Sequence, residues 1–350
     1  MPNTEFRLCY GYDDLLLVPR YSDLKSRSEA DPSFTFGEDK YKLPIIMSPM
    51  DLVCTKEMID FFTQNDLCPT LHRYFKCVED QIAFWRELES PEKVWVCVGS
   101  LQKYKNWIDT VLSHGVKKIL VDMANGESSL CIHTTEYLKS KENVNVIAGA
   151  VVTRSGFNRL QSLMGPGDGI RCGIASGSIC ATTLATGFGV PQATAVLDCA
   201  SIKNGDVILI ADGGVKTTGD AAKAIALGAD CVMMGKMLAG SSLAGGTLYD
   251  SEKNPLQNDQ RHKAKFRLYH GMASKEARIG VMQYASVEGV EGLVPYSGET
   301  SNIIRDIELN LKASLSYGGS RNWSQFKRNV KIVRAAFGGY LEKLTHVISK

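Results

Sequence analysis

The feature that most constrains the fold is a regular alternation of short apolar runs with longer amphipathic stretches. Most of the apolar runs are rich in Val, Ile and Cys and lack period-2 alternation, which is typical of strands buried on both faces of a parallel sheet. Eight runs are predicted as strands, at residues 44–50, 68–72, 94–100, 118–124, 144–151, 169–174, 207–211 and 230–235. Helices are expected between them, for example over 78–89 and 219–227, the second with Thr217 and Thr218 as candidate N-caps and Gly228 as a candidate C-cap.

Eight strands alternating with helices over about 190 residues predict a single α/β domain, a (β/α)₈ TIM barrel. From periodicity alone, a doubly wound open sheet is the alternative. Residues 1–43 are expected to be an N-terminal extension that caps the bottom of the barrel or runs across a neighbouring subunit. Residues 241–302 are expected to be a long active-site loop or flap after strand eight, with a tolerated insertion as the alternative. Residues 303–350 complete the 350-residue domain as a C-terminal helical segment.

Composition excludes several classes of protein. Forty basic and 38 acidic residues leave a formal charge of +2 without any block of like charge, so nothing favours a nucleic acid or membrane surface as partner. No apolar run reaches the roughly 18–20 residues that span a bilayer, and the first residues are too polar for a signal peptide. Ten cysteines without a CxxC pair predict reduced thiols and no zinc site, as in a cytoplasmic protein.

One thiol lies in a distinctive loop after the predicted sixth strand. The segment CGIASGSICATTLATGFGVPQ, residues 172–192, surrounds Cys180 with glycines and small hydroxyl residues. Such glycines let backbone amides and carbonyls turn toward a ligand, and stabilisation of a thiolate makes a cysteine a nucleophile. Thr182, two residues later, is a candidate proton relay. The alternative is a buried, inert cysteine, which is how the other nine are interpreted.

A phosphate site is expected after strands seven and eight. Asp212, Gly213 and Gly214 end the seventh strand, and Gly235 and Lys236 follow the eighth. Loops at these two positions form the usual phosphate site of a TIM barrel. Asp212 can accept hydrogen bonds from ribose hydroxyls while glycine amides bind the phosphate, although Gly-Gly after a strand is by itself a common turn.

Several motifs resemble one family in order along nearly the whole chain. The segment GSICATTLATGFGVPQ is similar to the catalytic cysteine loop of the IMP dehydrogenase/GMP reductase family. The resemblance continues in YDDLLLVP, PIIMSPMD, ADGGVKTTGDAAKAIALGAD, LYHGMAS and VEGVEGLVPYSG. It implies a TIM barrel, usually a homotetramer, in which cysteine adds to C2 of a purine nucleotide and hydride passes between that adduct and a nicotinamide.

Four features resemble the reductase branch, which uses NADPH to release ammonia from GMP and form IMP. Residues 24–29 read LKSRSE, residues 122–126 read DMANG, and about 20 residues between His72 and Val94 leave no room for a regulatory cystathionine-synthase-type domain. The stretch between Met272 and Glu288 also lacks the adjacent Arg-Tyr pair with which dehydrogenases activate water. The alternatives are a dehydrogenase without the regulatory domain, a reductase of a modified purine nucleotide, and a catalytically silent nucleotide sensor.

The resemblance assigns roles residue by residue. Cys180 is the expected nucleophile, and Thr182 with Glu288 the proton-transfer pair for departing ammonia. The implied substrate contacts are Ser178, Asp212, Gly213, Gly214, Gly235, Lys236, Gly271, Met272, Ala273 and Gly289. The implied NADPH contacts, some from a neighbouring subunit, are Ser26, Arg27, Arg73, Asp122, Met123, Ala124, Tyr284, Ser314 and Ser316. Carbonyls of Ala175, Gly177 and Cys180 fall where the family binds a monovalent cation such as K⁺.

The chain also departs from the reductase pattern. Ala285 and Thr183 stand where reductases have arginine, Arg73 replaces lysine, and Lys236 replaces glycine near the phosphate. The run Glu-Gly-Val-Glu-Gly after Val287 is more similar to bacterial dehydrogenases. These positions leave the choice of purine base open.

Overall fold

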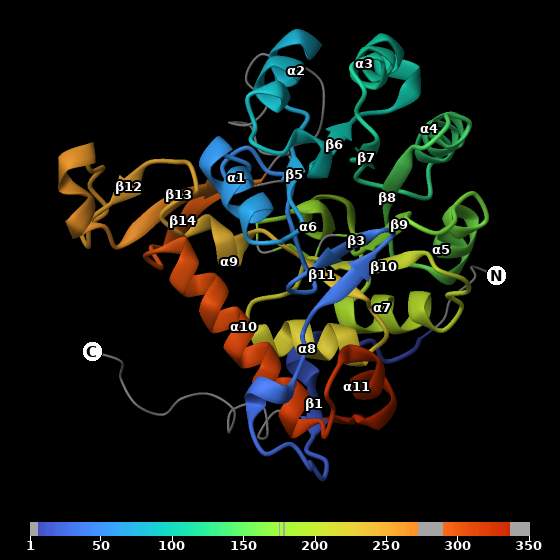
Figure 1. Ribbon diagram of the computed structural model, residues 1–350, viewed down its shortest axis with the longest axis vertical. Helices are drawn as coiled ribbons and strands as arrows, with labels where there is room; N and C mark the ends of the chain where they lie inside the picture. The colour runs from blue at the N-terminus through green and yellow to red at the C-terminus, as the bar shows by residue number, and fades with distance from the viewer. Residues whose placement is uncertain (1–5, 175, 178, 272–289, 337–350) are drawn as a thin grey trace.

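The computed structural model describes residues 6–174, 176, 177, 179–271 and 290–336, and eight parallel strands form its centre (Figure 1). Their order is β4-β11-β10-β9-β8-β7-β6-β5. The sheet closes on itself through a parallel bridge between Ile46 of β4 and Cys68, two residues before β5, where the amide of Met47 donates to the Cys68 carbonyl at 3.0 Å. The sheet therefore curls into a barrel, and the doubly wound open sheet is excluded. The barrel strands are β4 (Ile45–Met47), β5 (Thr70–Leu71), β6 (Trp95–Val98), β7 (Lys118–Val121), β8 (Asn145–Val151), β9 (Gly169–Cys172), β10 (Ile208–Asp212) and β11 (Cys231–Met234).

All eight predicted strands form where the sequence placed them, but most are shorter at the carboxyl end. The predicted strand at 118–124, for example, stops at Val121, and Asp122 begins the following loop. Apolar side chains keep the strands inside the sheet, whereas the polar residues that follow leave the ladder. The carboxyl ends are therefore where the polar groups of the barrel gather.

Helices follow the barrel strands; most cover the outside of the barrel, whereas the short α6 lies at its mouth (Figure 1). They are α1 (Lys56–Gln64), α2 (Val78–Arg86), α3 (Leu101–Ser113), α4 (Ser129–Lys139), α5 (Arg154–Gln161), α6 (Thr182–Thr186), α7 (Gln192–Ala200), α8 (Thr218–Ala226) and α9 (Lys236–Ala239). α8 begins at the predicted N-cap: Thr217 and Asp220 accept each other's backbone amides in a capping box. Its C-cap is Leu227, and Gly228 follows with φ +114°, so the predicted glycine lies one residue beyond the cap. Between β5 and β6 the chain forms α2 and the short helix η3 (Pro91–Lys93).

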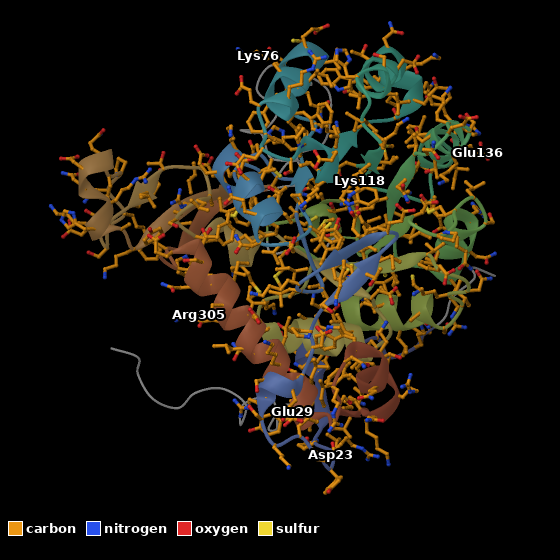
Figure 2. All side chains as sticks on the ribbon, in the orientation of Figure 1. Asp23, Glu29, Lys76, Lys118, Glu136 and Arg305 are labelled. Atoms are coloured by element: carbon orange, nitrogen blue, oxygen red, sulfur yellow. The ribbon has the colours of Figure 1, made fainter. Side chains whose placement is uncertain are left out.

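A hairpin from the N-terminal region fills the bottom of the barrel. It consists of β2 (Phe34–Phe36) and β3 (Asp39–Tyr41). Phe36 stacks on Trp95, the first residue of β6, with ring centroids 4.9 Å apart. Asp39 pairs with Lys118, the first residue of β7, at 2.6 Å, and Figure 2 labels that lysine. Because both partners start a strand, the hairpin closes the amino-terminal end of the barrel and leaves the carboxyl end for a site.

The rest of the N-terminal region pairs with the end of the chain. β1 (Leu15–Val18) runs antiparallel to β15 (Lys331–Arg334), and η1 (Tyr12–Asp14) and η2 (Arg27–Glu29) flank it. The helices α10 (Thr300–Tyr317) and α11 (Trp323–Asn329) pack against α8. The segment expected to be helical from 303 thus begins as a helix at Thr300 and includes a strand, because β15 finds its partner more than 300 residues away in sequence.

The segment after β11 forms a small antiparallel sheet beside the barrel, at the left of Figure 1. Its strands are β12 (Leu248–Tyr249), β13 (Phe266–His270) and β14 (Glu291–Pro295), with η4 (Asn258–Lys263) between the first two. The buried guanidinium of Arg267 donates to the carbonyls of Gly245 and Gly246 at 3.1 and 3.2 Å, which ties β13 to the chain leaving the barrel. Within the ranges described above, no helix has the length and apolar character needed to cross a membrane.

Candidate active site

A cavity of about 360 Å³ opens at the carboxyl ends of the barrel strands. Loops that follow β4, β5, β7, β9, β10 and β11 line it, together with Tyr269 and Gly271 at the end of β13. Parallel strands direct all their carboxyl ends to one side of a barrel, so residues far apart in sequence converge there. This convergence is the reason for taking the cavity as the candidate active site.

Cys180 places an accessible thiol in this cavity. Its Sγ lies 3.1 Å from Oγ1 of Thr182, and its amide donates to the Gly177 carbonyl at 3.1 Å. All ten cysteines are free thiols, and Cys180 alone among them is exposed. Burial raises the pKa of both Cys54 and Cys68 to about 12, so these thiols stay protonated and unreactive at neutral pH. Exposure therefore separates the predicted nucleophile from the structural cysteines.

The cysteine loop is pressed against the end of β10. A Cβ on Gly173, which has φ +145°, would lie 1.9 Å from the Asp212 carbonyl oxygen, so only glycine fits there. Gly213 has φ +90°, and a Cβ on it would lie 2.4 Å from the Ser176 hydroxyl. That hydroxyl donates to the Asp212 carbonyl at 3.0 Å. The thiol loop and the glycine turn thus form one unit on the rim of the cavity.

Gln192, the last residue of the cysteine-loop motif, joins the two strands beneath this unit. Its buried side-chain amide donates to the carbonyls of Cys172 and Asp212 at 2.7 and 3.2 Å. These carbonyls end β9 and β10, so the amide closes the gap between the strand ends. Gln192 therefore fixes where the loop returns to the barrel.

Four side chains of alternating charge cross the cavity wall. The Nε of Arg73 lies 3.2 Å from Asp122, whose other oxygen lies 3.0 Å from Nη1 of Arg171. Nε and Nη2 of Arg171 lie 2.9 and 2.8 Å from Oδ2 of Asp212. Burial by itself would raise the pKa of Asp122, but the charges of Arg73 and Arg171 outweigh it and hold the pKa below the usual value. Burial likewise opposes the charge of Arg171, and its two carboxylate partners raise its pKa instead.

The small sheet contributes one wall of the cavity. The hydroxyl of Tyr269 lies 3.2 Å from Sδ of Met50, in the loop after β4. Next to it on β13, Nε2 of His270 lies 2.9 Å from a carboxylate oxygen of Asp51. A Cβ on Gly235 would lie 2.8 Å from the Tyr269 hydroxyl, so the glycine allows β13 to approach the barrel mouth.

Most of the predicted site residues that the structure describes line this one cavity. They are Arg73, Asp122, Met123, Ala124, Gly177, Cys180, Thr182, Asp212, Gly213, Gly214, Gly235, Lys236 and Gly271. The predicted cofactor residues Ser26, Arg27, Ser314 and Ser316 do not line it. They belong to η2, with its N-cap Ser26, and to α10; these two helices pack against each other, and the Arg27 guanidinium lies 5.7 Å from the ring centre of Tyr317. Figure 2 labels Glu29 of η2 at that end of α10.

Several predicted site residues lie outside the described residues. They are Ala175, Ser178, Met272, Ala273, Tyr284, Glu288 and Gly289. The replaced position Ala285 is also outside them.

Sequence reasoning missed Arg171, Gln192 and Tyr269. Arg171 carried a signal that could have been noticed: a lone charge between Ile170 and Cys172 inside an apolar strand. Such a charge is almost never buried without a partner. Gln192 and Tyr269 stood within quoted motifs, but their contacts depend on segments distant in sequence.

The fold and the cavity together define a (β/α)₈-barrel enzyme with an exposed thiol at the carboxyl ends of its strands. The chain belongs to the IMP dehydrogenase/GMP reductase family, since the family model described as IMP dehydrogenase / GMP reductase domain matches residues 9–346. It is 32% identical to GMP reductase 1 of Homo sapiens over 349 residues, covering 95% of this chain and 97% of that protein. It is 33% identical to GMP reductase of Shigella flexneri over 344 residues, covering 93% and 94%.

A solved structure agrees with the fold. The crystal structure of a GMP reductase from Trypanosoma brucei in complex with guanosine 5′-monophosphate superimposes with a TM-score of 0.87. The match covers 98% of this chain and 99% of that chain at 23% sequence identity. This likeness establishes the barrel architecture.

Proposed function

We propose that this chain is an NADPH-dependent GMP reductase, which converts GMP to IMP and ammonia. One observation carries the proposal: the exposed thiol of Cys180 shares a single cavity with Asp212 and Asp122. A nucleophile, an acceptor for ribose hydroxyls and a carboxylate suited to a second ligand therefore face the same space. Membership of the family implies a nicotinamide cofactor, and the relatives named GMP reductase support the reductive direction.

The turn after β10 and the start of α9 are suited to hold the nucleotide. Oδ2 of Asp212 is occupied by Arg171, and Oδ1 has no hydrogen-bond partner among the described residues, so it can accept ribose hydroxyls. Gly213, Gly214 and Lys236 line the cavity, and we assign the glycine amides and the lysine charge to the phosphate. The base contacts expected from the resemblance are Ser178, Gly271, Met272, Ala273, Glu288 and Gly289.

The chemistry follows from the thiol and its neighbour. The Cys180 thiolate attacks C2 of GMP, and the bond from C2 to the exocyclic nitrogen breaks. Thr182, whose hydroxyl lies 3.1 Å from the sulfur, passes a proton from Glu288 to the departing nitrogen, and ammonia leaves a thioimidate on Cys180. When bound beside C2, NADPH would supply the hydride that C2 needs. The carbon–sulfur bond then breaks, Cys180 recovers its thiolate, and IMP is released; GMP, NADPH and two protons give IMP, NADP⁺ and ammonium.

The residues proposed for NADPH form two groups. Arg73, Asp122, Met123 and Ala124 line the cavity and suit the nicotinamide end, and the resemblance adds Tyr284. The second group consists of Ser26, Arg27, Ser314 and Ser316 on η2 and α10, and its guanidinium and hydroxyls are groups that can bind a 2′-phosphate. Because this group is outside the cavity, a neighbouring copy in a homotetramer would have to supply it. We further propose a cytoplasmic enzyme with K⁺ on the carbonyls of Ala175, Gly177 and Cys180.

A direct test supplies the purified protein with each substrate pair and follows cofactor absorbance. NADPH with GMP should be oxidised, with equal amounts of IMP and ammonia formed. In reverse, IMP with NADP⁺ should reduce the cofactor when ammonia is added and should yield GMP. Steady formation of XMP without ammonia would replace the proposal with a dehydrogenase. GMP binding without turnover in either direction would favour a nucleotide sensor or a modified purine substrate.

A further inference from the structure

The residue that connects the two proposed ligand sites is Arg171, on β9. Its side chain is 10% exposed, and it lies between Ile170 and Cys172, whose side chains are buried. Arg171 interrupts the apolar pattern of β9, and its side chain lines the cavity. A buried charge of this kind is retained only where its partners satisfy it.

Arg171 holds the two carboxylates from different edges of one guanidinium. Nη1 lies 3.0 Å from Asp122, on the proposed cofactor side, while Nε and Nη2 lie 2.9 and 2.8 Å from Asp212, on the proposed ribose side. The guanidinium is planar and presents its N–H groups in a fixed geometry. The separation and orientation of the two carboxylates are therefore set by one rigid group.

The far end of this chain of charges is also held in place. Arg73 contacts Asp122 at 3.2 Å, and its Nη2 lies 3.2 Å from the hydroxyl of Tyr74, whose ring centre is 4.6 Å from the guanidinium carbon. Asp122 consequently has a cation on each side. A carboxylate restrained in this way responds to movement of either neighbour.

We infer that Arg171 is a positioning residue that couples nucleotide binding to cofactor binding. The inference rests on the proposed function for the identity of the two ligands. Ribose hydroxyls that bind Asp212 restrict its carboxylate, and through the shared guanidinium they restrict Asp122 before the cofactor arrives. The second ligand then loses less conformational entropy on binding, so each ligand binds more tightly when the other is present.

The experiment measures GMP affinity by isothermal titration calorimetry with and without saturating NADP⁺. GMP and NADP⁺ can bind together without turnover, because NADP⁺ has no hydride to donate. In the wild-type protein, NADP⁺ should tighten GMP binding by at least about fivefold, the lower end of typical coupling between sites. Arg171→Lys keeps the charge but cannot contact both carboxylates in the same way. The coupling ratio is the Kd for GMP without NADP⁺ divided by the Kd with NADP⁺. In this variant the coupling ratio should fall to within about twofold of one, while KM rises for both GMP and NADPH.

Two further variants separate coupling from stability. Asp122→Asn weakens the middle contact without touching Asp212 and should also remove the coupling. Lys139→Gln is the matched control, because Lys139 lies 2.8 Å from Asp168, just before β9 at the opposite end of the same strand. It should lower the free energy of unfolding and leave the ratio unchanged.

The outcomes distinguish this inference from the proposed function. A wild-type ratio near one, or an unchanged ratio in Arg171→Lys and Asp122→Asn, would overturn the coupling role while GMP reduction stands. If the wild-type protein binds no GMP, both the function and the coupling are wrong.

Discussion

Removing the Asp212 carboxylate should weaken nucleotide binding and also lower the free energy of unfolding. In Asp212→Ala, the ribose hydroxyls lose the acceptor at Oδ1, and Arg171 loses two contacts of 2.9 and 2.8 Å. A hydrogen bond to a charged group contributes about 1.5–3 kcal/mol, so losing one from the ribose should raise the Kd for GMP about 10- to 150-fold. Arg171 keeps Asp122 as a partner, which limits the loss in unfolding free energy to about 1–3 kcal/mol.

Calorimetric titration tests the rise in the Kd for GMP, and urea unfolding tests the loss in unfolding free energy. Asp220→Ala is the matched control on the same β10–α8 segment, because Asp220 caps α8 and does not line the cavity. The control should lose about 1–3 kcal/mol of stability, because it removes the capping box and one partner of the buried Lys223, and should keep GMP affinity within about twofold. If folded Asp212→Ala also binds GMP within about twofold of wild type, the ribose is held elsewhere and the assignment of Asp212 is wrong.

Three other predictions follow from the site and its surroundings. Cys180→Ala should lower turnover by at least about 10³-fold while GMP binding persists, and residual activity above about a tenth would rule out covalent catalysis. Gly213→Ala should cost activity and about 1–3 kcal/mol of stability through its positive φ and its clash with Ser176, whereas Gly205→Ala, also at positive φ but in open space, should cost stability alone; equal effects on activity would contradict this. Burial lowers the pKa of His72 to about 4 from 6.5, so the unfolded chain gains a proton first and stability falls as pH drops from 6.5 toward 4. Wild type should lose about 1.4 kcal/mol more than His72→Gln between pH 7.5 and 5.5 in urea unfolding, and identical losses would refute the assignment.

The sequence alone was sufficient for the barrel strands and for the thiol loop. Runs such as 144–151 form strands that are buried on both faces. A strand of this kind needs apolar residues at nearly every position, and such a run can be recognised from neighbouring residues alone. The loop around Cys180 was visible for a similar reason, because glycines and small hydroxyl residues at a strand end are a local pattern. The cap at Thr217 is local too, since its partner Asp220 is three residues away.

Contacts between distant segments were decided only by the tertiary structure. Arg171 lies 49 residues from Asp122 and 41 from Asp212, so the pattern showed a charge in a strand without showing its partners. The pairing of β1 with β15 joins the two ends of the described chain, and no periodicity in either strand specifies the other. Ser26 and Ser314 do not line the cavity, and the sequence could not show this. A local sequence pattern predicts whether a side chain is buried, whereas the closed barrel determines which distant side chains meet.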